Sequence, residues 1–215
     1  MFTPHKCMRL LFIKPKHIGD TLILTPTLQA ARNKYPEAEI WVLVRKGCES
    51  ILSGCNALNR IVSTSAPNTK WIDRSLHAYK DLRVVLELRK QQFDIAFELS
   101  ATERGRHIAI LSGAKKLCTN ETVKILPKIW SNRFDIKSSF NWEFRHSVEK
   151  DFYTVNEALP LDGDIPPLIF STKLTKPCNL SNLENFAIIH PSTRWERKKW
   201  PFKKWEELGR KLLDR

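Results

Sequence analysis

Short apolar runs alternate along the chain with longer segments in which apolar residues recur every three or four positions. Runs of the first kind are typical of buried strands, and segments of the second kind are typical of amphipathic helices. We expect strands at Leu10–Ile13, Glu39–Arg45, Arg60–Ser63, Phe93–Leu99 and Lys115–Thr119. We expect helices at Thr21–Tyr35, Gly47–Leu52, Leu76–Gln92, Glu103–Leu111 and His146–Leu159. This order predicts βαβ units, and therefore an α/β fold with a parallel sheet and right-handed crossovers.

Two segments of this first part have a less regular pattern. Leu76–Gln92 is predicted to be a basic amphipathic helix. Its inner stripe is expected to comprise Leu82, Val85, Leu86 and Leu88. Glu121–Phe144 shows no clean period and is predicted to be a long irregular loop, of a size that often serves as a lid or a binding loop.

A proline-rich stretch, Pro160–Leu183, predicts a boundary between two domains. A strand is predicted after it at Phe186–His190, and a helix at Pro201–Arg215. The expected organisation is a first domain at residues 1–172, a linker at 173–184 and the start of a second domain at 185–215. One strand and one helix are too little to fold alone, because independent folding needs about 40 residues. The chain is therefore expected to be a fragment or a truncated product of a two-domain protein.

The composition indicates a packed protein with reduced cysteines. Hydrophobic residues make up 42% and aromatic residues 10% of the 215 residues, which argues against a disordered chain. No apolar stretch approaches the roughly 18 residues that span a bilayer. The five cysteines form no Cys-x-x-Cys pair, which favours free thiols over a disulfide framework.

The net charge of +13 favours a polyanionic partner or surface. Positive charge is dense at Arg194–Lys204, which holds six basic residues and one acid. Nucleic acid, anionic lipid and phosphorylated saccharide all carry the complementary charge. No zinc-finger spacing, RNA-recognition run or helix-turn-helix pattern is present in the sequence, which argues against nucleic acid.

The junction between the first strand and the first helix carries the strongest candidate chemistry. Gly19 is expected to permit a tight turn there, and Asp20 occupies the expected position of a helix N-cap. Ligands of open α/β sheets bind beyond the carboxyl ends of the strands. Two interpretations of Asp20 stay open on these grounds: a plain capping residue, or a carboxylate that also performs chemistry.

Two segments of the chain resemble glycosyltransferase family 9, the bacterial ADP-heptose lipopolysaccharide heptosyltransferases. KPKHIGDTLILTPTLQAARNKYPEAEIWVLV is similar to the family's first strand, Gly-Asp pair, Thr-Pro helix and Tyr-Pro. FAIIHPSTRWERKKWP is similar to the segment that opens the family's donor domain, and the two segments stand in the family's order. The resemblance implies a GT-B fold, in which a Rossmann-like acceptor-side domain faces a Rossmann-like donor domain and no metal or other cofactor is used.

The resemblance also implies roles for individual residues. Asp20 matches the general base that takes the proton from the acceptor hydroxyl. Ser192 and Thr193 match the positions that contact the donor phosphates. Lys198 matches the lysine that neutralises the leaving diphosphate, a task that a metal ion performs in other enzymes.

Further residues fall near family positions that meet the acceptor, and these are His17, Arg104 and Arg106. Arginines at a helix start are equally compatible with a solvent-facing role. His146 and Glu149 match a His-x-x-Glu stretch of the family and are expected to be structural. Asp162-Gly163-Asp164 is expected to be a turn, and no metal site is expected.

The implied activity is transfer of a heptose from ADP-heptose to the acidic lipid A–Kdo inner core of lipopolysaccharide, at the cytoplasmic face of the inner membrane. Two alternatives stay open: an inactive remnant that keeps acceptor binding, and a basic nucleic-acid-binding protein. The sequence lacks the family's downstream residues that would enclose the base, the ribose and the heptose. The 215-residue chain is therefore expected to be inactive or nearly so.

Overall fold

The computed structural model describes residues 7–65, 71–121, 127–170, 186–193 and 196–213, and for residues 71–79 it describes the backbone only. The chain divides into two compact units, residues 1–173 and 174–215, which are described separately below. The linker predicted at 173–184 lies entirely outside the described residues.

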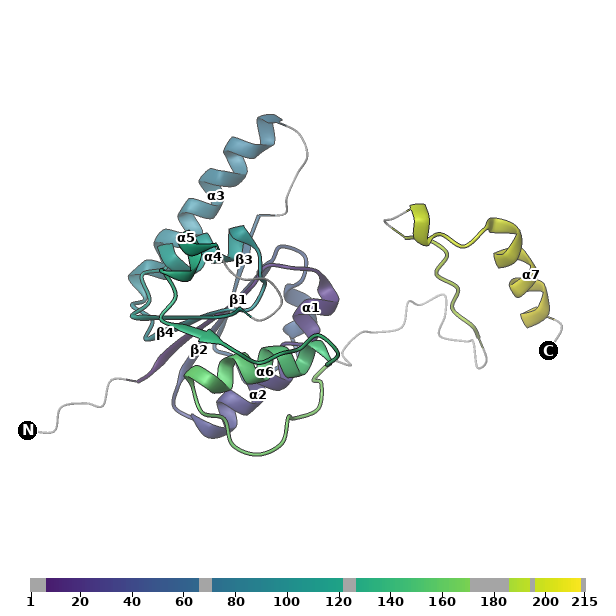
Figure 1. Ribbon diagram of the computed structural model, residues 1–215. Coiled ribbons are helices and arrows are strands. Elements are labelled where there is room, and N and C mark those ends of the chain that lie inside the picture. The colour runs from purple at the N-terminus through teal and green to yellow at the C-terminus, as the bar shows by residue number, and fades with distance from the viewer. Residues whose placement is uncertain (1–6, 66–70, 122–126, 171–185, 194–195, 214–215) are drawn as a thin grey trace, which may run out of the picture. The chain divides into compact units, whose positions relative to one another are not determined.

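The first unit is built on one sheet of six parallel strands (Figure 1). The strands are β1 (Arg9–Lys14), β2 (Glu39–Arg45), β3 (Arg60–Thr64), β4 (Ile95–Glu98), β5 (Lys116–Asn120) and β6 (Ile136–Ser138). Their order across the sheet is β3-β2-β1-β4-β5-β6, and each neighbouring pair is parallel. The predicted α/β fold with a parallel sheet is thereby confirmed.

Helices cover both faces of this sheet, as Figure 1 shows. α2 (Thr25–Lys34) and α6 (Ser147–Ala158) pack on one face, and α3 (Trp71–Lys90) and α4 (Glu103–Leu111) pack on the other. The side chains of β1 alternate between two cores: Leu10 and Phe12 join the first, and Leu11 and Ile13 join the second. Because both faces are covered, the central strands are continuous apolar runs, and this is why the sequence identified them.

The segment predicted to be a long irregular loop contains two short elements, so that prediction was wrong in part. α5 (Lys128–Ser131) and β6 both lie within Glu121–Phe144, while residues 122–126 are outside the described part. β6 has only three residues and pairs with β5 alone. A strand this short at a sheet edge carries too few apolar residues to produce a period in the sequence.

The first predicted helix is two helices, α1 (Ile18–Leu22) and α2. Proline lies in the first turn of α2, where its missing N–H costs nothing and where it prevents α1 from continuing without a break. α1 also begins earlier than predicted, with His17 as its N-cap and Asp20 as its third residue. The predictions of Asp20 as the N-cap and of Gly19 as a turn residue were therefore wrong.

The inner stripe predicted for α3 is only half correct. Val85 and Leu88 are buried, whereas Leu82 is 52% exposed and Leu86 is 50% exposed. Leu82 and Leu86 lie one turn apart on one face of the helix, and this face adjoins the buried face that carries Val85 and Leu88. The sheet and α4 cover the buried face and leave a leucine pair in solvent.

The second unit contains a short 3-10 helix, η3 (Glu196–Lys198), and α7 (Phe202–Leu213). α7 agrees with the helix predicted at Pro201–Arg215. The strand predicted at Phe186–His190 is absent: the structure gives these residues no regular hydrogen bonding. A strand requires a neighbour to exchange backbone hydrogen bonds, and no described residue provides one.

The cysteines and the lengths of the helices can be compared with the composition. The described cysteines Cys7, Cys48, Cys55 and Cys118 are free, and Cys178 lies outside the described residues. Burial raises the pKa of the Cys118 thiol to about 12. Among the helices that the structure describes, none is long and apolar enough to cross a membrane.

Candidate active site

The order of the strands creates a topological switch point beside β1, where open α/β sheets bind their ligands. The chain runs from β1 outwards to β2 and β3, and then crosses to β4 on the other side of β1. At such a switch point the loops after two neighbouring strands diverge, and the carboxyl ends of the strands are left open to a ligand. The strands end there in Lys14, Arg45 and Glu98.

Asp20 lies at this edge, in the short helix that follows β1 directly. Its Oδ2 accepts a hydrogen bond from the His17 backbone N–H at 3.2 Å, which ties the carboxylate to the start of α1. Its Oδ1 is 3.6 Å from the Lys16 ammonium. The side chain is 27% exposed, so a ligand can reach the carboxylate while the protein holds it in place.

Gly19 leaves the surface beside Asp20 open. A Cβ placed on Gly19 would meet nothing within 4 Å, and its backbone does not require the left-handed region. Neither packing nor a turn therefore explains this glycine. A missing side chain next to a partly exposed carboxylate allows a ligand to approach the backbone closely.

His17 and Arg45 form a second polar pair at the same edge. Arg45 Nη1 lies 3.2 Å from His17 Nδ1, which makes the ring nitrogen the acceptor of the guanidinium proton. The pair places a fixed cation close to the loop that carries Asp20. In the part of the chain that the structure describes, no cluster of His, Cys, Asp or Glu has the make-up of a metal site.

A buried ion pair lies beneath this loop. Lys14, the last residue of β1, contacts Asp151 of α6 through its ammonium group, and both side chains are almost fully buried. Burial raises the pKa of Asp151, Lys14 opposes that rise, and the nearby Asp20 carboxylate adds to it. Burial lowers the pKa of the neighbouring Lys150, whose ammonium group lies 4.4 Å from the centre of the Trp142 ring.

The loop between β4 and α4 is fixed by a buried carboxylate. Glu98 accepts hydrogen bonds from the Ser100 backbone N–H at 2.9 Å, from the Ser100 hydroxyl and from the Thr119 hydroxyl at 3.2 Å. Thr102 then caps α4 by accepting a hydrogen bond from the Gly105 N–H at 3.1 Å. This network determines where α4 begins relative to the carboxyl edge of the sheet.

Gly105 is expected to be irreplaceable in that network. A Cβ at this position would overlap the Ser100 hydroxyl and the Glu98 carboxylate. We expect Gly105→Ala to lower the free energy of unfolding by about 1–3 kcal/mol, the usual cost of overpacking. Gly19→Ala is the matched control, because it is also a helical glycine but has open space around it and should not destabilise the fold. Urea unfolding of the two variants measures the difference, and equal stability would show that the loop adapts freely.

The two predicted acceptor arginines have different surroundings. Arg104 is engaged inside the first unit: its guanidinium pairs with Asp81, with Nε–Oδ2 at 2.9 Å, and donates to the Ser65 backbone oxygen at 2.8 Å. Arg106 is half-buried, and its Nε is buried without a hydrogen-bond partner among the described residues. Arg104 therefore uses its guanidinium donors within the protein, whereas Arg106 leaves at least one donor without a partner among the described residues.

The predicted donor residues lie in the second unit. Ser192 is exposed, with its hydroxyl 3.5 Å from His190 Nε2, and Thr193 is half-buried. Lys198 is exposed at the end of η3. The three residues lie within one short segment that leads into α7, and their predicted role in binding phosphate stays a prediction.

His146 and Glu149 have the structural role predicted for them. His146 is the N-cap of α6 and accepts a hydrogen bond from the Val148 N–H at 3.2 Å. Glu149 returns the contact by accepting from the His146 N–H at 3.2 Å. This reciprocal pair is a capping box with histidine in place of the usual hydroxyl residue.

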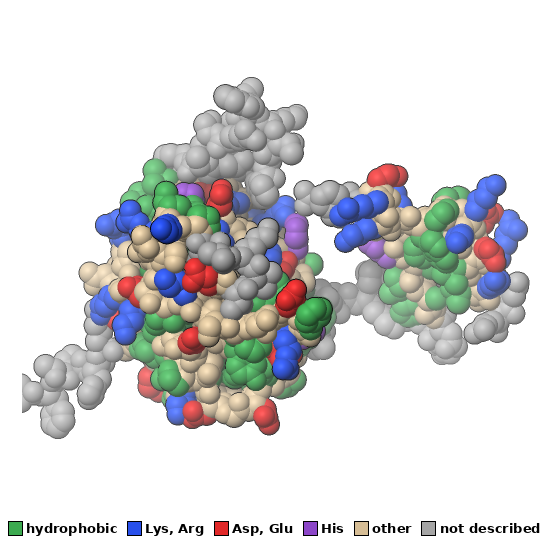
Figure 2. Space-filling view, viewed as in Figure 1, with side chains coloured by type: hydrophobic (Ala, Val, Ile, Leu, Met, Phe, Trp, Pro, Cys, Tyr) green, Lys and Arg blue, Asp and Glu red, His purple; other side chains and the backbone are tan. Residues whose placement is uncertain are grey.

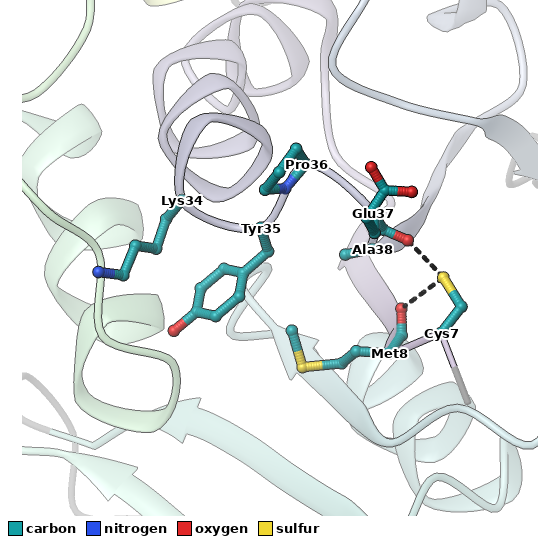
Figure 3. Close-up of a pocket in the computed structure, with 7 residues that line it drawn as sticks. All are labelled: Cys7, Met8, Lys34, Tyr35, Pro36, Glu37 and Ala38. Atoms are coloured by element: carbon teal, nitrogen blue, oxygen red, sulfur yellow. Dashed lines mark hydrogen bonds between the residues drawn. The ribbon is translucent and has the colours of Figure 1, made fainter. Parts of the chain in front are cut away.

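A cavity of about 470 Å³ lies at the opposite edge of the sheet (Figure 3). Its lining comes from the start of β1 and from the turn between α2 and β2, including Cys7, Met8, Tyr35 and Pro36. The Tyr35 hydroxyl donates to the Pro160 backbone oxygen at 2.9 Å. Because this cavity opens at the amino ends of the strands, it is separate from the carboxyl edge where Asp20 lies.

Sequence reasoning missed Lys14, Lys16 and Arg45. Lys16 precedes Asp20 by four residues, and this spacing signals contact once the helix start is known. Arg45 ends β2, which is a neighbour of β1 in the sheet. The order of the strands would therefore have indicated Arg45 as a residue of the site. The partner of Lys14 is 137 residues away in the sequence, and no local pattern indicates it.

Comparisons with known proteins find likeness in structure only. No protein-family model matches the chain, and no curated protein sequence matches it. A glycosyltransferase of family 9 from Veillonella parvula DSM 2008 aligns with a TM-score of 0.61 at 14% identity, over 76% of this chain and 44% of that protein.

Two Escherichia coli heptosyltransferases align over 96% of this chain. WaaC with ADP-2-deoxy-2-fluoro heptose has a TM-score of 0.69 at 19% identity, and ADP-heptose lps heptosyltransferase II has a TM-score of 0.63 at 17% identity. The chain spans 66% and 62% of their lengths. It therefore shares the GT-B type α/β fold of these enzymes along its own length, and the predicted resemblance to the family is confirmed at the level of fold.

Proposed function

We propose that the protein is a glycosyltransferase in which Asp20 is the general base. The observation that carries the proposal is the position of Asp20: a held, partly exposed carboxylate at the switch point of the sheet, beside an open glycine. The shared fold with two heptosyltransferases supports the same interpretation. The surroundings of Asp20 are polar and lie where open α/β sheets bind ligands, so a sugar hydroxyl can bind there.

The proposed reaction is a displacement at the anomeric carbon of a nucleotide sugar. Asp20 accepts the proton of an acceptor hydroxyl while that oxygen forms the new bond to the anomeric carbon. The bond between this carbon and the diphosphate breaks, and the diphosphate leaves with the electron pair. Attack from the side opposite the leaving group inverts the configuration. In this proposal Lys198 balances the charge of the diphosphate, and Ser192 and Thr193 donate hydrogen bonds to it.

The acceptor is proposed to be an acidic saccharide bound to the first unit. Lys16 holds positive charge next to Asp20, Arg45 contacts His17 in the same loop, and the half-buried Arg106 lies in α4, which begins at the same edge of the sheet. These cations suit phosphate or carboxylate groups on the acceptor. Together with the family resemblance, they favour the lipid A–Kdo inner core as acceptor and ADP-heptose as donor. The proposed site of action is the cytoplasmic face of the inner membrane.

The chain by itself is expected to bind this acceptor and to transfer almost no sugar. Calorimetry should detect a soluble Kdo-containing core saccharide, with affinity that falls as salt rises. ADP-heptose should bind weakly, because contacts at its phosphates alone do not compensate for the cost of ordering the whole molecule. Arg106→Ala should weaken acceptor binding, whereas Arg133→Ala, on the exposed surface after α5, serves as the control.

Three outcomes decide the proposal. Salt-sensitive acceptor binding that depends on Arg106 supports the acceptor-side role of the first unit. No binding to any acidic saccharide contradicts it. Tight donor binding with measurable product on Kdo-lipid A would show that the chain is active as it stands, with a second copy completing the donor site.

A further inference from the structure

An apolar surface crosses α3, α4 and α5 on the first unit. Its exposed members are Leu82 and Leu86 of α3, Leu111 of α4, which is 44% exposed, and Ile129 of α5, which is 72% exposed. We name these four residues the α3–α5 surface. Figure 2 shows hydrophobic side chains with lysine and arginine side chains around them on the side of the unit where these helices lie.

A groove of about 410 Å³ runs between α3 and α4 within this surface. Leu82 and Val85 form one wall, and Ile108 and Leu111 form the other. His107 lines the groove as well and meets the Trp130 ring edge to face, with centroids 4.7 Å apart. The groove therefore joins the leucine pair of α3 to the aromatic side of α5.

Two acids near this surface are paired within the protein, and Glu103, at the polar end of the groove, is exposed without an ion pair among the described residues. Asp81 is paired with Arg104, and Glu87 is paired with Arg60 at 2.5 Å. Four exposed cations of α3 and of the α5 region border the surface, and none of them forms an ion pair with an acid among the described residues: Arg89, Lys90, Lys128 and Arg133. The surface thus combines exposed leucines with a surplus of positive charge.

We propose that the α3–α5 surface docks on an anionic lipid bilayer, with the leucines entering the headgroup region and the cations contacting the lipid phosphates. Leucine beside lysine and arginine on one helical face is the composition of helices that lie in a membrane interface. Two of the four cations are lysines, which are depleted at protein–protein interfaces. These two features favour a lipid surface over a protein partner.

The apolar side of α7 is a weaker candidate for the same role. Phe202 and Leu213 are highly exposed there, but the two acids of the helix are paired within it. Glu206 bonds Arg210 at 2.6 Å, and Glu207 bonds Lys211 at 2.7 Å. α7 therefore keeps two exposed cations without an ion pair among the described residues, Lys203 and Lys204, against four beside the α3–α5 surface.

The location of the groove connects membrane docking to the proposed base, and this connection rests on the proposed function. Glu103 and Arg104, at its polar end, begin α4 directly after the carboxyl end of β4. The groove therefore starts at the same edge of the sheet as Asp20 and runs along α4 to Leu111 of the α3–α5 surface. A bilayer on it would bring a lipid-linked acceptor to the edge where the proposed base lies.

Vesicle co-sedimentation of the full chain tests the proposal. One set of vesicles consists of phosphatidylcholine, and the other of phosphatidylcholine mixed with phosphatidylglycerol, neither containing lipopolysaccharide. We expect binding to the mixed vesicles that falls about tenfold in the Leu82→Gln/Leu86→Gln double variant. Arg89→Gln/Lys90→Gln should lower binding by at least a similar factor, because each basic side chain near an anionic surface contributes measurably.

Matched control variants distinguish binding through this surface from non-specific adsorption to the vesicles. Lys116→Gln/Lys203→Gln removes the same charge elsewhere, and Phe202→Gln/Leu213→Gln removes apolar area from α7; both should leave binding nearly unchanged. Circular dichroism melting confirms that each variant is folded. Equal loss with either control pair would overturn the proposal, as would absence of binding to the mixed vesicles.

Three further outcomes are also decisive. Self-association in gel filtration that disappears in the leucine variant would assign the surface to a second copy of the chain and overturn lipid docking. Because the vesicles contain no sugar acceptor, vesicle binding without acceptor binding would retain this inference and defeat the proposed function. Acceptor binding without vesicle binding would do the reverse.

Discussion

Asp20→Asn is expected to lower the rate of sugar transfer by about 10²–10⁴-fold, the usual contribution of a general base. The amide oxygen of asparagine still accepts the hydrogen bond from the His17 N–H, so the start of α1 should be preserved. What is lost is the ability to take a proton. Donor binding should hardly change, because the predicted donor residues belong to the other unit.

The measurement is a transfer assay on a form of the protein that is active, with saturating ADP-heptose and a Kdo-lipid acceptor. Asp164→Asn, an exposed aspartate of the same unit, is the control and should retain full activity. Asp20→Ala removes the capping contact as well and should also lower stability. If Asp20→Asn transfers sugar at the original rate while Asp20→Ala melts earlier, Asp20 is a structural residue only.

Lys14→Met is expected to lower the free energy of unfolding by about 3–5 kcal/mol. The substitution leaves Asp151 buried without its counter-ion, and an uncompensated buried charge is among the largest single defects in a protein. Part of the loss is relieved if Asp151 takes up a proton, which is easier because burial already raises its pKa. Urea unfolding monitored by circular dichroism gives the free energy for each variant.

The double variant Lys14→Met/Asp151→Leu tests whether the loss of stability comes from breaking the ion pair. With both charges removed together, the defect disappears, and the stability should return close to the original value. Lys115→Met is the matched surface control, because its pair with Asp94 is exposed and should contribute less than about 1 kcal/mol. Single effects that simply add in the double variant would show that the two side chains do not act as a pair.

The sheet was predictable because its strands are buried on both faces. Glu39–Arg45 and Glu103–Leu111 were predicted with the bounds that the structure gives to β2 and α4. The failures occur where a local pattern is weak or misleading. Ile136–Ser138 is too short to show a period, and Phe186–His190 has a strand-like sequence without a described strand to pair with.

The candidate site was predictable in position and less so in detail. The strand–Gly-Asp–helix order placed Asp20 at the carboxyl edge, and β1 does end there. The local role of Asp20 depended on where α1 begins, and helix starts are the least certain feature of a sequence pattern. The Lys14–Asp151 pair is a contact between distant parts of the chain, which only the assembled fold reveals.

The central place of β1 has a consequence for how the first unit is synthesised and folded. One side of β1 pairs with β2, which follows soon after it in the chain. The other side pairs with β4, and the Arg9 N–H bonds an aspartate 85 residues further along. Until that segment leaves the ribosome, an apolar strand has an open edge that other strands can join. A parallel sheet with such distant partners folds slowly, so the growing chain depends on protection of β1 during this interval.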